Sequence, residues 1–70
     1  MKVSARNTLP GVVKQVKPGA VNAEVTLELA PGLTIVSIIT LEAAKSLKLK
    51  KGKIAYAVIK ASSVIIGVDQ

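Results

Sequence analysis

Hydrophobic and polar residues alternate along much of the chain, and this pattern predicts a protein built mainly of β-strands. The alternation is most regular over residues 21–29, where every second residue is apolar. Because side chains along a strand point alternately to its two faces, one set should face the core and the other should face outward. The predicted inward set is Val21, Ala23, Val25, Leu27 and Leu29, and the outward set is Asn22, Glu24, Thr26 and Glu28.

Further strands are predicted on both sides of this segment. Leu9-Pro10-Gly11 is typical of a turn or bulge, and Pro18-Gly19 and Pro31-Gly32 are typical of tight turns that join antiparallel strands. The predicted strands cover residues 1–7, 12–17, 33–39, 54–59 and 64–68. Residues 33–39 are apolar on both faces, so we expect burial on both sides, with one face against another subunit.

One segment, residues 40–49, departs from the strand pattern and predicts a short helix. Thr40 is a good N-cap, Glu42 lies in the first turn, and Lys45 and Lys48 lie near the end, where each charge suits the helix dipole. Lys50-Lys51-Gly52 should end the helix. The elements together predict an all-β fold, a small OB-like barrel of about five strands with one short helix, in a single domain over residues 1–70.

The composition favours assembly over a self-sufficient single chain. Half of the 70 residues are hydrophobic, nearly all aliphatic, and the chain has no cysteine, histidine, tryptophan or phenylalanine. A domain of this size without disulfides or metal has a marginal core, so we expect it to bury aliphatic surface in a homo-oligomer. The first residues hold no apolar run typical of a signal peptide, and no apolar stretch approaches the roughly 20 residues of a membrane span. We therefore expect a cytoplasmic protein that does not bind membranes.

The charged residues argue against an enzyme and leave several anionic partners open. The net charge is +6, and the four acidic residues are scattered without histidine or cysteine beside them, so we expect no catalysis. An OB-like barrel with a basic surface could bind nucleic acid, and this is the main alternative function. That class of platform stacks bases on aromatic side chains, however, and Tyr56 is the single aromatic residue. The lysines at positions 45–53 are explained at least as well by a solvated helix end.

Two polar stretches near the ends of the chain have the chemistry of an oxyanion site. Ser4 and Arg6 share one face of an extended chain, as do Lys60 and Ser62. A tetrahedral dianion is held by donors alone, such as guanidinium, ammonium, hydroxyl and backbone N–H groups, and neither stretch holds a carboxylate. The plain alternative is that Arg6 and Lys60 are ordinary surface charges and that the serines cap strand ends.

An ordered set of motifs favours the oxyanion reading. The set comprises Ser4-Ala5-Arg6-Asn7 with Leu9 and Gly11, then residues 23–28, 34–40 and 57–64. With these motifs the chain resembles the molbindins, the small molybdate- and tungstate-binding Mop proteins of TOBE type, from Ser4 to the last predicted strand. The resemblance implies an OB-like domain that forms a hexamer, a trimer of dimers, with anion sites between subunits.

The resemblance also assigns site residues and a ligand. It implies that Ser4, Arg6, Lys60 and Ser62 contact molybdate or tungstate, with the backbone N–H groups of Ala5 and Ala61 as further donors. Some family members carry serine at the position of Ala61, so one hydroxyl is missing here. A second site is placed at the turn formed by Gly19, Ala20, Val21 and Asn22. The implied function is storage or buffering of the anion, with no cofactor and no direct protein–metal ligands. We rank this function above a nucleic-acid-binding or regulatory module, and rank a purely structural oligomerisation domain third.

Overall fold

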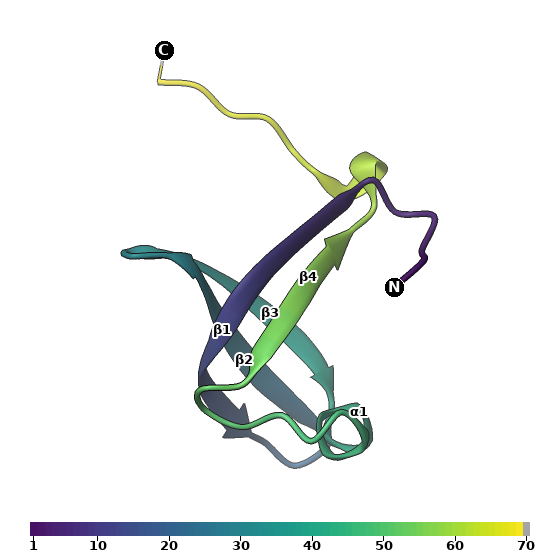
Figure 1. The fold of residues 1–70 in the computed structure, drawn as a ribbon, viewed down its shortest axis with the longest axis vertical. Coiled ribbons are helices and arrows are strands. Elements are labelled where there is room, and N and C mark those ends of the chain that lie inside the picture. Colours follow the sequence, from purple (N-terminus) through teal and green to yellow (C-terminus); the bar gives the residue numbers. More distant parts are fainter. Residues whose placement is uncertain (70) are drawn as a thin grey trace.

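Four antiparallel strands form one curled sheet in the computed structural model, which describes residues 1–69 (Figure 1). The strands are β1 (Asn7–Pro18), β2 (Asn22–Ala30), β3 (Leu33–Thr40) and β4 (Ile54–Ile59), in the sheet order β3-β2-β1-β4. Helix α1 (Leu41–Ser46) follows β3, and a 3-10 turn, η1 (Ala61–Ser63), follows β4. The all-β, OB-like fold with one short helix is confirmed.

The core lies on the inner face of the two central strands. Val13, Val25 and Leu27 are 1–5% exposed and form the centre of the core cluster, and Ala23 of β2 is also buried. Ala23, Val25 and Leu27 are therefore confirmed as inward positions, whereas Leu29 is only partly buried, as are Thr26 and Glu28 of the predicted outward set. Val21 is 72% exposed, because β2 begins one residue later and Val21 belongs to the preceding turn, where its carbonyl accepts a hydrogen bond from the Leu41 N–H at 2.9 Å.

The prediction of a turn or bulge at Leu9-Pro10-Gly11 is wrong. These residues lie inside β1, where Pro10 pairs with Tyr56 and Gly11 pairs with Ala55 of β4. Glycine is needed there for a close approach between strands, because a Cβ at Gly11 would lie 2.9 Å from the Glu28 carbonyl oxygen of β2. The two strands predicted over residues 1–7 and 12–17 are thus one strand that begins at Asn7, and its irregularity falls between Val13 and Gln15.

The predicted helix is present and begins as expected. The Thr40 Oγ1 accepts a hydrogen bond from the Ala43 N–H at 3.0 Å, with Glu42 in the first turn and Lys45 in the last. The helix ends at Ser46, earlier than predicted, and Lys48 adopts a φ of 53°. The Lys53 ammonium donates to the Leu47 carbonyl oxygen at 2.7 Å, so a cation satisfies a carbonyl at the helix C-terminus.

Two expectations about the outer strands do not match the single chain. Residues 64–68, predicted as the last strand, form no strand and run away from the sheet (Figure 1). Residues of β3 are also not buried on both faces, since Val36 is 54% and Ile38 is 62% exposed. In the described chain the sheet therefore ends at β3 on one side and at β4 on the other, and each of these edge strands has one neighbour.

Candidate oxyanion-binding site

The pairing of β1 with β4 brings the two predicted donor stretches to the same end of the sheet. The terminal pair of this antiparallel ladder joins Asn7 to Ile59. Arg6 is the residue directly before β1, and Lys60 is the residue directly after β4. The amide of Asn7 holds the two strand ends together, because its Nδ2 donates to the Ile59 carbonyl oxygen at 3.3 Å. Residues more than fifty positions apart in sequence thus become neighbours in the fold.

A single 3-10 turn positions the second stretch. The Ser63 N–H donates to the Lys60 carbonyl oxygen at 2.9 Å, and the Val64 N–H donates to that of Ala61 at 3.3 Å. These bonds bend the chain directly after β4 and hold Ala61 and Ser62 next to the strand end. Among the turn and loop hydrogen bonds of the described residues, the N–H groups of Ala5 and Ala61 donate none to the backbone, which suits their predicted role as anion donors.

The electrostatics of this end favour an anion. Within residues 1–69 the structure shows one ion pair, Lys14 with Glu28 at 3.5 Å, so neither Arg6 nor Lys60 is neutralised by a carboxylate there. Ala5 is half-buried, whereas Ser4, Arg6, Lys60, Ala61 and Ser62 are exposed. The donors of one chain therefore gather at one place but stay open to water. An anion held there would need further walls to exclude solvent.

The second predicted site lies at the other end of β1. Gly19, Ala20 and Val21 form the turn between β1 and β2, and Asn22 begins β2; the Gly19 N–H donates to the Asn22 carbonyl oxygen at 2.7 Å. Gly19 and Asn22 line a shallow hollow of about 230 Å³ together with Lys17, which sequence reasoning did not single out. The position of Lys17 directly before the Pro18-Gly19 turn is the sequence signal that could have identified it. Glu24 lines the same hollow, so this place is less uniformly basic than the first.

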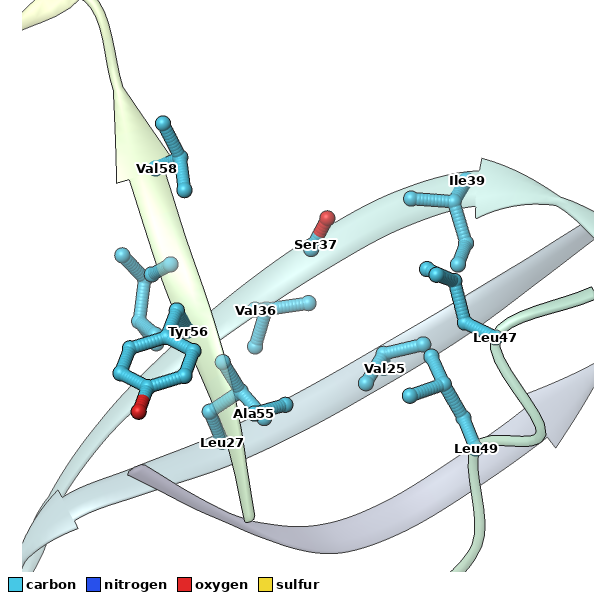
Figure 2. A pocket seen from close by; sticks show the side chains of 12 residues that line it. Val25, Leu27, Val36, Ser37, Ile39, Leu47, Leu49, Ala55, Tyr56 and Val58 are labelled. Carbon is cyan, nitrogen blue, oxygen red and sulfur yellow. The ribbon is translucent and has the colours of Figure 1, made fainter. Parts of the chain in front are cut away.

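A third cavity is apolar and lies between the two edge strands (Figure 2). This β3–β4 groove has a volume of about 320 Å³, and its polar side chains are those of Ser37 and Tyr56. With no charged residue in its lining, it suits aliphatic side chains and not a dianion. The groove is lined by Val25, Leu27, Ile35, Val36, Ser37, Ile39, Leu47, Leu49, Ala55, Tyr56, Ala57 and Val58.

The geometry also bears on the nucleic-acid alternative. Tyr56 lines the β3–β4 groove, whereas Lys50 and Lys51 line a separate hollow with Lys14, Gln15 and Thr26. A single-strand platform needs the stacking ring and the cations along one path. Here they line different hollows, which weakens that reading.

Metal and membrane signals were also sought in the part of the chain that the structure describes. Residues 1–69 contain no cluster of three or more His, Cys, Asp or Glu side chains that could hold a metal ion. Over the same residues, no helix has the length and apolar character required to cross a bilayer.

Comparison with known proteins gives consistent matches over almost the whole chain. The family model of the TOBE domain matches residues 3–66. The chain is 48% identical over 66 residues to Molybdenum-pterin-binding protein 3 of Clostridium pasteurianum, an alignment that covers 94% of this chain and 97% of the relative.

Solved structures share the fold at similar levels of identity. MopII from Clostridium pasteurianum superimposes with a TM-score of 0.89 at 45% identity, covering 96% of this chain and all of that one. The cytoplasmic molybdate-binding protein ModG, in a crystal form with molybdate bound, superimposes with a TM-score of 0.93 at 56% identity. That match covers 99% of this chain and 49% of ModG. The fold is thus shared with MopII and with the molybdate-binding protein ModG.

Proposed function

This chain belongs to the TOBE domain family, and within it to the molbindin or Mop type, and from that premise we propose that it binds molybdate at sites between copies of itself. Tungstate, a tetrahedral dianion of the same kind, would bind through the same donors. In this proposal residues 1–70 act as one oxyanion-binding domain that stores or buffers the anion in the cytoplasm, with no cofactor and no reaction catalysed.

The observation that carries the proposal is the meeting of two donor stretches at one end of the β1–β4 ladder. The Arg6 guanidinium offers a two-pronged fork and the Lys60 ammonium a point charge. The hydroxyls of Ser4 and Ser62 and the N–H groups of Ala5 and Ala61 complete a set made only of donors. The comparison supports the choice of ligand, because the homologous protein ModG was crystallised with molybdate bound.

Exposure of the donors is the reason to place the sites between copies. In one chain the cations and hydroxyls lie in water, where the attraction for an anion is weak. A neighbouring copy would supply walls and further donors, and the exposed aliphatic surface of the chain would drive the association. We propose a hexamer, as a trimer of dimers, with a second set of sites at the turn Gly19–Asn22. Bound anion would then stabilise the assembly by mass action.

Isothermal titration tests this function directly. The protein is titrated with molybdate, tungstate, sulfate and phosphate in turn, and with a single-stranded oligonucleotide. We expect saturable heat with molybdate and tungstate, because both are tetrahedral dianions that the donor set can surround. Saturable heat from the oligonucleotide, with none from any of the four anions, would contradict the proposal and favour the nucleic-acid alternative.

A further inference from the structure

A basic hollow lies along the second half of β1, away from Arg6 and Lys60. It has a volume of about 730 Å³, and we name it the lysine hollow. None of its lining side chains is a carboxylate, and none belongs to either anion site proposed above. The lining consists of the cations Lys14, Lys50 and Lys51, the uncharged polar residues Gln15 and Thr26, and the apolar residues Val16 and Leu49.

Backbone hydrogen bonds fix one wall of this hollow. The loop between α1 and β4 carries Lys50 and Lys51 and passes beside β1 (Figure 1). The Val13 N–H donates to the Lys53 carbonyl oxygen, and the Gly52 N–H donates to that of Val13, both at 2.8 Å. Within the loop, the Lys53 N–H donates to the Lys50 carbonyl oxygen at 3.1 Å. The backbone of the two lysines is thus already ordered, which lowers the entropy cost of binding a partner there.

The charges of the lysine hollow are almost free of counter-charges. Over residues 1–69 the one ion pair joins Lys14 to Glu28 at 3.5 Å, and both side chains are partly exposed, so water screens the pair. In the same part of the chain, Lys50 and Lys51 have no carboxylate within ion-pair distance. A second copy is a poor source of the missing charge, because its four acidic residues are never adjacent in sequence and its net charge is also +6. The hollow therefore suits an acidic segment of a different protein.

The strand beside the hollow also offers unpaired backbone. β1 pairs with β4 over residues 7–12 and with β2 over residues 12–18. The two bonds at Val13 are the last contacts on the β4 side, so in the described chain residues 14–17 have a strand on one side only. This edge starts at the irregularity between Val13 and Gln15, and a bulge bends the strand that contains it. A free edge of this kind can accept an extended peptide as an added strand.

We propose that the lysine hollow docks an acidic, extended segment of another protein, and that this segment pairs with the free edge of β1 over residues 14–17. The side chains of an added strand alternate between two faces. An acidic set would lie with the lysines, and an aliphatic set would cover Val16 and Leu49, which are partly buried against the core. The segment should therefore alternate acidic and aliphatic residues. This inference goes beyond the proposed function and does not depend on the anion.

The apolar part of the hollow favours a peptide over other anionic partners. Val16 and Leu49 make no polar contact with a phosphate, whereas they can pack against aliphatic side chains. A nucleic-acid platform stacks bases on aromatic side chains, and the lining of this hollow has none. The lining also has no arginine fork to grip a lone small anion, which would keep much of its water.

Fluorescence polarisation with a defined peptide tests the docking. The probe is a short labelled peptide of alternating glutamate and valine, capped at both ends, and we expect saturable binding. A matched peptide with serine in place of valine keeps the charge but lacks the apolar set, so it should bind at least tenfold more weakly. No binding of the first peptide, or equal binding of the two, would overturn the inference.

N-methylation of the peptide tests the pairing with the β1 backbone. Along an added strand, every second N–H points toward the edge that it joins, and the others point away. One isomer is methylated on its valines and the other on its glutamates. We expect one isomer to bind at least tenfold more weakly and the other to bind like the unmethylated peptide. Equal affinities of the two isomers would exclude an added strand and overturn the inference.

Substitutions in the protein locate the surface. We expect Lys50→Ala with Lys51→Ala to weaken peptide binding at least tenfold. Lys2→Ala with Lys45→Ala removes the same charge at exposed positions outside the hollow and should bind like the parent. Loss of self-association by the first variant alone in ultracentrifugation would make the hollow a contact between copies. Tighter binding of a single-stranded oligonucleotide, abolished by the same two substitutions, would make it a nucleic-acid surface. Either result would overturn the inference.

The anion site supplies the control that separates this inference from the proposed function. Arg6→Ala should bind the peptide like the parent, and saturating molybdate should not displace the peptide. Displacement would mean that peptide and anion share one site, and would overturn the inference. If the parent binds molybdate but not the peptide, the inference fails and the function stands. If it binds the peptide but ignores molybdate, the function fails and the inference stands.

Discussion

Val13 and Ile65 are both β-branched aliphatic residues, but Val13 is 1% exposed in the sheet centre and Ile65 is 93% exposed in the segment after η1. The difference divides the molecule into two regions. Around Val13, the central strands β1 and β2 bury their inner faces within one chain. At the outer strands, in residues 64–68 and at the donor end, formed by residues 4–6 and 60–62, aliphatic and cationic side chains lie in water.

This contrast shows how so short a chain can fold and still need copies of itself. The central region supplies the local stability that lets the strands form. The outer region keeps unused strand edges, an open groove and unneutralised cations, all of which gain free energy from a partner. Substitutions in the two regions should therefore affect different measurements, and the following predictions are ordered from the largest expected effect to the smallest.

The largest effect is expected from Leu27→Ala in the central region. Leu27 is 5% exposed in the core cluster, and truncating such a leucine leaves a cavity that costs about 2–5 kcal/mol of unfolding free energy. Urea denaturation followed by circular dichroism measures the loss. The matched control is Leu33→Ala at the start of β3, where the side chain is 56% exposed and the cost should stay within about 0.5 kcal/mol. Equal losses for the two leucines would remove the distinction between the regions.

Substitutions at the donor end should affect anion binding without unfolding the chain. We expect Arg6→Ala and Lys60→Ala each to weaken molybdate binding at least tenfold, or about 1.4 kcal/mol, because each removes a cation that has no carboxylate partner. Titration calorimetry measures the change, and ultracentrifugation at high protein concentration should show the oligomer intact. Lys45→Ala on α1 is the control and should bind as the parent does. Unchanged affinity in both donor variants would place the site elsewhere.

The smallest effect is expected at the N-cap of α1. Thr40→Ala removes the acceptor of the 3.0 Å bond from the Ala43 N–H and should cost about 1 kcal/mol of unfolding free energy. Thr40→Ser keeps the hydroxyl and should restore most of the stability. Because α1 lies apart from the donor end, molybdate affinity should not change in either variant. A loss of affinity in Thr40→Ala that Thr40→Ser does not correct would mean that the helix start contributes to the site.

Sequence reasoning succeeded where local chemistry decides the structure. The alternation from Ala23 to Leu27 predicted the buried face of β2, and the Thr40 hydroxyl predicted the helix start, because both depend on nearby residues. It failed at Pro10-Gly11, where a usual turn signal lies inside a strand. That position is decided by the close approach of the β2 backbone to Gly11, which only tertiary structure reveals.

The same division holds for the candidate site and for residues 64–68. The two donor stretches were predicted to converge, and the β1–β4 register does bring them to one end, while the roles of Arg6 and Lys60 in binding stay predictions. Residues 64–68 have strand-forming composition, yet they form no strand in the single chain. A strand needs an edge to pair with, and composition does not say which chain supplies that edge.

The exposure of residues 64–68 has a further consequence for the lifetime of the protein. Proteases bind their substrates as extended, accessible backbone, and a lone copy offers such a stretch over residues 64–68. Where association with another copy covers that stretch, the cleavage site disappears. We therefore expect degradation to remove orphan copies and spare complete assemblies, so that turnover itself helps to keep the population assembled.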